Sequence, residues 1–387
     1  MNINDLLKIA VERKASDIHL KVGSHPVIRV DGQLMPIQEA KRLMQEDTIS
    51  MGFSMMSARQ KQIFKEELEL DIAYSVPGLG RFRVNIFQQR GSVGLVLRVI
   101  PARVATVREL MLPPVLEQIV GESRGLVLCT GTTGSGKSTS LAAMIDHINS
   151  TRTEHILTIE DPIEFLHRDK KSIVNQRELN ADTRTFSSAL RAGLRQDPDV
   201  ILVGEMRDFE TIETALHAAE TGHLVFSTLH TIDATETINR IISVFPPHQQ
   251  KQIRIQLGQV LRSVISLRLL PRADGVGRVP AAEVLVSTPY IRECIENKEK
   301  TKYIREQIAG GTSQYGMQTF DQSLFKLYKS GLITLEEALR RASNADEFKL
   351  KLQGIQSTAD IAREEMESTL DVGGETDLLA ETFEIES

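Results

Sequence analysis

Two patterns of hydrophobic and polar positions divide the chain near residue 110. Before it, short stretches alternate apolar and polar residues with the period of two that is typical of half-buried strands. After it, short and almost fully apolar runs alternate with helical stretches, as in proteins whose parallel strands are buried on both faces. We therefore predict an α+β domain over residues 1–101, a linker over 102–109 and an α/β domain over 110–355.

The amino-terminal pattern predicts a mixture of helices and strands. Apolar residues between Leu6 and Val11 recur at helical spacing and predict a first helix. One predicted strand, 81–89, places apolar side chains on one face and Arg81 and Arg83 on the other. The other predicted elements are strands at 17–20, 27–30, 70–75 and 93–100 and one helical stretch over about 47–67.

The carboxyl-terminal pattern predicts strands that are each followed by a helix. A wide apolar stripe from Ile253 to Leu269 predicts one long helical region after them. The predicted strands are 126–129, 156–159, 200–203 and 224–226, and the predicted helices are about 138–149, 187–196, 209–220, 323–327 and 334–341.

The charge is unevenly distributed along the 387 residues. Ten of the 52 acidic residues but one of the 46 basic residues lie in 360–387, within a tail over 356–387 that has the composition of a disordered segment. Because the rest of the chain is nearly neutral, the composition argues against a protein dedicated to nucleic-acid binding.

Other features of the composition indicate a cytosolic protein. No apolar run is long enough to span a membrane, and the first residues lack the pattern of a secretory signal. Cys129 and Cys294 are too far apart in the sequence to predict a metal knuckle or a disulfide framework. We expect a cytoplasmic protein without a membrane-spanning segment.

The strongest chemical signal is the glycine-rich stretch between the first parallel strand and the helix after it. Residues 131–138 match the phosphate-binding loop pattern at every fixed position. Backbone N–H groups of such a loop and the following helix N-terminus face a chain of phosphates. We expect Lys137 to reach the β and γ phosphates of ATP and the Ser138 hydroxyl to bind Mg²⁺. The expected nucleotide-binding residues are Gly131, Thr132, Thr133, Gly134, Ser135, Gly136, Lys137, Ser138 and Thr139.

Acidic residues follow two other apolar strands. Glu205 takes the place of the usual Walker B Asp, so we expect its contact with Mg²⁺ to run through water. Pro162 stops the strand 156–159, and the acids around it project from the carboxyl end of the sheet, where ligands bind in open α/β folds. We predict that Glu164 activates the attacking water and that Glu160 orients the water around Mg²⁺, although the two roles could be exchanged.

Taken together, these residues resemble a known family, the secretion-type hexameric ATPases, and within it the type IV pilus retraction ATPases of the PilT/PilU type. The resemblance covers about residues 3–350. It rests on the phosphate loop, on 159–164 as the family's Asp box and on 221–230 as its His box. Further matching stretches are 15–20, 80–85, 194–199 and 315–321.

The resemblance implies a PAS-like amino-terminal domain and a RecA-like motor domain, assembled as a homohexameric ring. It implies catalytic roles for His223 and His230 of the His box. It also implies that Arg81, Arg83 and Arg98 reach the γ-phosphate of a neighbouring subunit as arginine fingers; local pairing on the strand surface is the alternative.

The function implied by the resemblance is Mg²⁺-dependent ATP hydrolysis that powers pilus retraction and twitching motility. The implied location is cytoplasmic, docked at the inner-membrane base of the pilus machine on a platform protein. The stretch 290–299 keeps only Ile291, Arg292 and Ile295 of a pattern typical of many retraction ATPases. An accessory paralogue that works beside a second retraction ATPase therefore stays open.

Three other functions compete with this reading. A pilus-assembly or type II secretion ATPase usually carries a four-cysteine zinc site, which two cysteines cannot build. A ring that binds ATP without turnover is disfavoured by the intact phosphate loop and acids. A nucleic-acid translocase is disfavoured because the chain has no Trp and five Tyr for base stacking.

Overall fold

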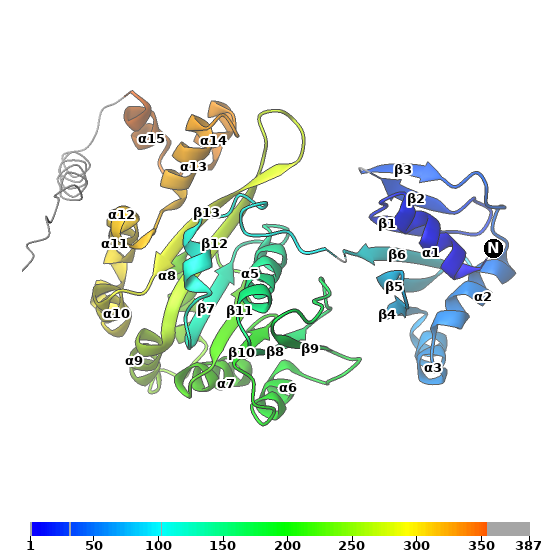
Figure 1. Cartoon of the computed structure of the whole chain (residues 1–387), viewed down its shortest axis with the longest axis horizontal. Helices are drawn as coiled ribbons and strands as arrows, with labels where there is room; N and C mark the ends of the chain where they lie inside the picture. The colour runs from blue at the N-terminus through cyan, green and yellow to red at the C-terminus, as the bar shows by residue number, and fades with distance from the viewer. Residues whose placement is uncertain (1, 31, 102, 354–387) are drawn as a thin grey trace, which may run out of the picture. The chain divides into compact units, whose positions relative to one another are not determined.

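The computed structural model describes residues 2–30, 32–101 and 103–353, and the chain divides into two compact units (Figure 1). The first unit runs to Val104 and includes Pro162–Arg168, and the second holds Ala105–Asp161 and the chain from Asp169 onward. The division after Val104 falls inside the stretch 102–109 predicted as the linker. The predicted acidic tail, 356–387, lies outside the described residues.

The first unit is a six-stranded antiparallel sheet with helices on one face. The helices are α1 (Ile3–Glu12), α2 (Gln45–Met55) and α3 (Ala58–Glu67). Phe82, Val84 and Ile86 are fully buried beneath these helices, so Arg81 and Arg83 lie on the opposite face, as predicted. In spatial order the strands are β3 (Gln33–Pro36), β2 (Val27–Val30), β1 (Asp17–Leu20), β6 (Ser92–Ile100), β5 (Gly80–Gln89) and β4 (Glu69–Val76).

The first unit differs from the sequence prediction in two places. The single helical stretch over 47–67 is two helices, because Ser57 begins a new one by accepting a hydrogen bond from Gln60 N in a capping box. Strand β3 was not predicted, because all four of its residues are exposed and no apolar alternation marks it.

The second unit is built on a seven-stranded sheet that is parallel except at one edge. The phosphate-loop strand, β7, lies inside the sheet, and the antiparallel edge strand is β13. This is the mostly parallel, doubly covered sheet predicted from the sequence. In spatial order the strands are β13 (Arg278–Val286), β12 (Leu261–Pro271), β7 (Gly125–Thr130), β11 (Leu224–Leu229), β10 (Val200–Val203), β8 (His155–Glu160) and β9 (Ile173–Glu178).

Helices cover both faces of this sheet. Short α4 (Val115–Ile119) and long α5 (Lys137–Thr151) contribute to a core on one face. The core on the other face takes apolar side chains from α6 (Phe186–Gly193), α7 (Phe209–Glu220), α8 (Ala234–Ser243) and α9 (Gln250–Val260). Among the described residues, every helix is too short or too polar to span a membrane.

The long helical region predicted over 253–269 was wrong. Helix α9 ends at Val260, and the chain continues as strand β12, which pairs with β7 and β13. A strand buried on both faces shows a nearly continuous apolar run, which periodicity alone does not distinguish from a buried helix.

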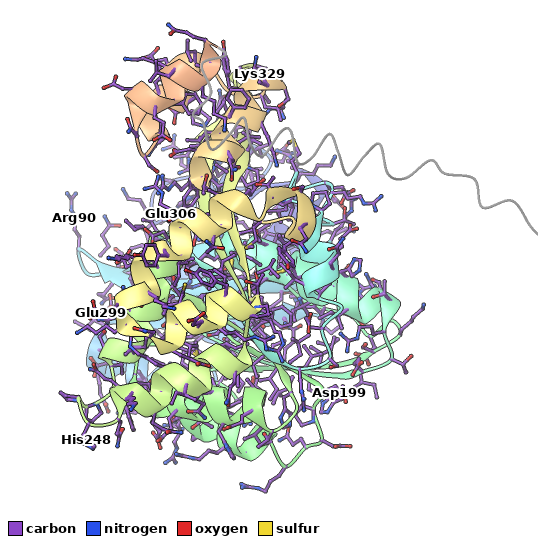
Figure 2. All side chains as sticks on the ribbon, turned by 90° about the vertical axis from the view of Figure 1, so that its left-hand side faces the viewer. Arg90, Asp199, His248, Glu299, Glu306 and Lys329 are labelled. Carbon is purple, nitrogen blue, oxygen red and sulfur yellow. The ribbon has the colours of Figure 1, made fainter. Side chains whose placement is uncertain are left out.

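Further helices follow β13. Helices α10 (Pro289–Glu296), η1 (Lys298–Tyr303), α11 (Ile304–Gly310) and α12 (Thr312–Tyr315) come first in the chain. They are followed by α13 (Phe320–Lys329), α14 (Leu335–Arg341) and α15 (Ala345–Leu352), which pack around the β12–β13 hairpin. In Figure 2, the labelled Glu299, Glu306 and Lys329 mark η1, α11 and α13.

Candidate functional site

The phosphate loop has a backbone that only glycine permits. It leaves β7 after Thr130 and enters α5 at Lys137. Gly131 has φ 140° and Gly136 has φ 98°, both on the side that L side chains avoid. A Cβ on Gly131 would lie 2.5 Å from the carbonyl oxygen of Leu267 and 2.5 Å from Ser135 Oγ. The loop therefore packs tightly against the backbone of β12 at Leu267.

The loop's polar groups fit a chain of phosphates. Lys137 is 9% exposed, and its Nζ donates to the carbonyl oxygens of Gly131 at 2.7 Å and Thr132 at 3.1 Å. Ser135 Oγ is buried and has no hydrogen-bond partner among the described residues. A buried hydroxyl without a partner is costly, and a bound phosphate oxygen would supply one. Ser138 and Thr139 lie half-buried in the first turn of α5.

Three predicted site residues lie at the same edge of the sheet as the loop. Glu160 ends β8, Glu205 follows β10 and His230 follows β11. These strands run parallel to β7 in the order β7, β11, β10, β8, so their carboxyl ends lie side by side. The structure therefore brings Glu160, Glu205 and His230 to the edge that carries the phosphate loop.

Glu160 is held by its own strand and by the neighbouring one. Its Oε1 accepts hydrogen bonds from Thr158 Oγ1 at 2.6 Å and from Gln176 Nε2 of β9 at 3.1 Å. Such contacts hold a half-buried carboxylate in one orientation, as a residue that orients water requires.

Glu205 lies between a cation and a histidine. Its Oε2 is 2.8 Å from Arg207 Nε and 3.7 Å from His230 Nε2. Thr228 Oγ1 of β11 donates to the carbonyl oxygen of Gly204 at 2.7 Å, which holds the end of β10 in place. Sequence reasoning missed Arg207; its position two residues after Glu205 was the available signal.

His223 is not brought to this edge. It precedes β11, whereas His230 follows that six-residue strand, so the two histidines are roughly 20 Å apart along it. His223 Nδ1 lies 2.8 Å from the carbonyl oxygen of Ala218, and its own carbonyl oxygen accepts from Gly125 N. A catalytic role for His223 stays a prediction.

Glu164 belongs to the first unit, because that unit includes Pro162–Arg168. Arg81, Arg83 and Arg98 lie in the same unit. Glu164 is exposed, and its predicted role as the base stays a prediction. On the helix-free face of the sheet, Arg83 and Arg98 are direct register partners on β5 and β6. Arg98 Nε lies 3.0 Å from Asp17 Oδ1, so this arginine has the local ion pair that was the alternative to a trans role.

The model of the family described as Type II/IV secretion system protein matches residues 1–275. The chain belongs to this family. It is 48% identical to the type IV pilus retraction ATPase PilT of Pseudomonas aeruginosa, over 90% of this chain and 100% of that protein. It is 42% identical to the type IV pilus ATPase PilU of the same organism, over 93% of this chain and 94% of that protein.

A solved structure gives the same result. The crystal structure of the pilus retraction motor PilT with bound ADP superposes with a TM-score of 0.83 at 49% identity, covering 90% of this chain and 98% of that one. The resemblance to secretion ATPases of the PilT type and the predicted α/β fold class are thereby confirmed.

Proposed function

We propose that this chain is a motor that hydrolyses ATP with Mg²⁺ and powers the retraction of a type IV pilus. The observation that carries the proposal is the phosphate loop with Glu160, Glu205 and His230 at one edge of a parallel sheet. The similarity to PilT over that protein's whole length supports the same function.

Residues of the second unit have separate roles in hydrolysis. The loop amides and Lys137 bind the phosphates, and Lys137 exchanges its bonds to the loop carbonyls for bonds to phosphate oxygens. Ser138 and Glu205 would hold Mg²⁺, which neutralises charge that develops on the phosphates. Glu160 orients water. His230, next to Glu205, contacts the terminal phosphate.

The arginines of the first unit act on a neighbouring subunit in a homohexameric ring. Arg83 and Arg98 are directly opposite each other, and like charges in that arrangement destabilise a sheet. Asp17 relieves this repulsion through its ion pair with Arg98, so the phosphate of a neighbouring subunit would be the partner of Arg81 and Arg83, on the face opposite the core. Glu164 from the same unit takes the proton of the attacking water.

The ring works in the cytoplasm at the inner-membrane base of the pilus machine, where it pushes on a platform protein. Identity to PilT, at 48%, exceeds identity to PilU, at 42%, and this favours the main retraction motor over an accessory paralogue. A zinc-bearing assembly ATPase remains disfavoured, because a four-cysteine site cannot be built from the two cysteines of the chain, Cys129 and Cys294.

Two measurements test the proposal. Phosphate release by the purified chain should require both ATP and Mg²⁺, and EDTA should stop it. Cells that lack the gene should carry excess pili and fail to twitch. Bald cells would instead indicate pilus assembly, and normal retraction would indicate an accessory role.

A further inference from the structure

A row of buried polar residues crosses the sheet beside the phosphate loop. Thr130, the last residue of β7, is the register partner of Ser266 on β12, and Ser266 is the partner of Glu283 on β13. Register partners point to the same face of a sheet. Thr130 Oγ1 donates to Ser266 Oγ at 2.8 Å, and Glu283 is only 5% exposed. An acid buried at the end of this row requires an explanation.

The carboxylate of Glu283 holds the start of helix α8. Its Oε1 accepts a hydrogen bond from the backbone N–H of Ala234 at 2.9 Å. Ala234 is the first residue of α8, and an N–H there has no partner within the helix. The cap residue, Asp233, binds Glu236 N instead, at 2.7 Å. Glu283 therefore supplies from β13 the partner that the helix itself lacks.

The first turn of α8 is bonded to the loop before it. Ile232 N donates to Glu236 Oε2 at 2.9 Å, and the hydroxyl oxygens of Thr231 and Thr237 are 2.6 Å apart. The loop and the first turn thus form one bonded piece. His230 begins this loop, 3.7 Å from Glu205.

We propose that Glu283 is a positioning residue for the candidate active site: by anchoring the start of α8, it holds the loop of His230 in place beside Glu205. The inference rests on the proposed function, because the reason for holding His230 there is hydrolysis. Glu283 itself touches no reacting atom.

Three charged groups face Glu283 from the elements packed around it. The pKa of Glu283 is raised to about 7: burial is the main cause and Asp233 adds to it, whereas the hydrogen bond from Ala234 N, Arg305 of α11 and Arg268 of β12 act against the increase. A side-chain oxygen accepts an N–H bond in both the charged and the protonated acid. The anchor therefore depends on the oxygen atom, and a glutamine would preserve it.

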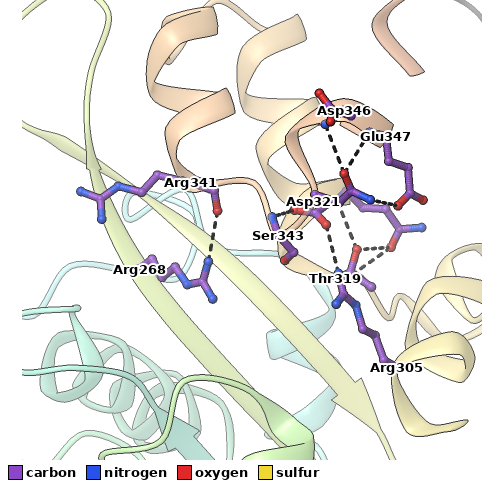
Figure 3. A network of polar contacts seen from close by, with 10 residues as sticks. Arg268, Arg305, Thr319, Asp321, Arg341, Ser343, Asp346 and Glu347 are labelled. Atoms are coloured by element: carbon purple, nitrogen blue, oxygen red, sulfur yellow. Dashed lines mark hydrogen bonds and ion pairs between the residues drawn. The ribbon is translucent and has the colours of Figure 1, made fainter. Parts of the chain in front are cut away.

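The two arginines are themselves held by the carboxyl-terminal helices (Figure 3). Arg268 stacks 3.8 Å from the centre of the Phe320 ring and donates to the carbonyl oxygen of Arg341 at 3.3 Å. Arg305 pairs with Asp321 at 3.2 Å, and Asp321 accepts from Ser343 N at 2.8 Å. The groups around Glu283 are thus fixed by α11, α13 and α14.

The test compares Glu283→Leu, which removes the oxygen, with Glu283→Gln, which keeps it. Glu337→Leu is the matched control, because Glu337 is a buried carboxylate on α14 that pairs with Arg340 and Arg341. Amide hydrogen exchange over 231–237 is measured on the nucleotide-free full-length chain, and kcat and KM for ATP are measured in parallel.

We expect Glu283→Leu to speed exchange over 231–237 by about tenfold or more, as for a buried N–H left without its acceptor. Its kcat should fall by about tenfold or more with KM changed by less than about threefold. Glu283→Gln should match the wild type in both, and Glu337→Leu should change neither. If Glu283→Leu does not fold, Glu283→Met takes its place with the same expectations.

Wild-type exchange and turnover in the apolar variant would overturn the inference. So would a glutamine variant as defective as the apolar one, because the oxygen would then not be the anchor. If the wild type itself hydrolyses no ATP, the proposed function fails, and exchange over 231–237 alone decides whether Glu283 holds the loop.

Discussion

At the scale of single residues, Lys137 has the surroundings of a phosphate-binding lysine. It is nearly buried, and its Nζ donates to two carbonyl oxygens of its own loop, those of Gly131 and Thr132. Lys137→Ala removes the cation that binds the phosphates and should lower the rate of Mg²⁺-dependent ATP hydrolysis about 100-fold or more. Phosphate release measures this, with circular dichroism as the control for folding. Turnover within twofold of the wild type would rule out the assigned site.

The two glutamates of the Asp box differ in how firmly they are held. Glu160 accepts two hydrogen bonds, whereas Glu164 is exposed. Glu164→Gln keeps the shape but loses the proton acceptor, so we expect it to bind ATP normally and to hydrolyse it about 100-fold more slowly. Glu160→Gln should be less damaging. Nucleotide affinity and single-turnover rates measure both variants, and the opposite ranking would exchange the two roles.

At the scale of structural elements, the tightness of the phosphate loop can be tested with two glycines. Gly131 and Gly275, in the β12–β13 hairpin, both have positive φ, but only Gly131 has atoms within 4 Å of an added Cβ. Gly275→Ala should cost only backbone strain, about 1–2 kcal/mol. Gly131→Ala should cost more, because its Cβ meets a carbonyl oxygen at 2.5 Å.

Thermal unfolding and ATP titration distinguish the two glycine variants. We expect Gly131→Ala to unfold at the lower temperature and to bind ATP at least about tenfold more weakly, since the loop amides lose their arrangement. Gly275→Ala should bind ATP as the wild type does. Equal behaviour of the two variants would mean that the loop relaxes around the added methyl group.

At the scale of the whole molecule, shared sites predict complementation between two inactive chains. If Arg81 and Arg83 act in trans, Lys137→Ala chains and chains with Arg81→Ala and Arg83→Ala should regain activity when co-expressed. Some interfaces then join an intact loop to intact arginines. Arg98 is left unchanged in both chains because it is paired with Asp17.

The size of the arginine effect makes this test sensitive. Removing an arginine finger costs about 10³–10⁵ in rate, so a minority of restored interfaces should exceed the background. The measurement is ATP turnover of mixed rings, whose mixing is checked by two different affinity tags. If mixed rings are no more active than rings of either variant alone, Arg81 and Arg83 pair locally on the strand surface and do not act in trans.

The sequence by itself determined the features that depend on local pattern. The phosphate loop, the parallel strands 156–159 and 200–203 and the acids after them could all be predicted, because loop chemistry and short apolar runs are encoded in neighbouring residues. The same local reasoning assigned Arg81 and Arg83 to the face opposite the core of their strand.

The tertiary structure alone decided the features that depend on distant partners. Residues 261–271 became a strand because β7 and β13 supply hydrogen-bonding edges on both sides. His223 and His230 are both in the predicted His box, but the length of the strand between them carries one away from the phosphate loop. Glu283 could not be singled out from the sequence, because its partner, Ala234 N, is 49 positions away. Burial and a backbone contact, rather than a motif, give that residue its proposed role.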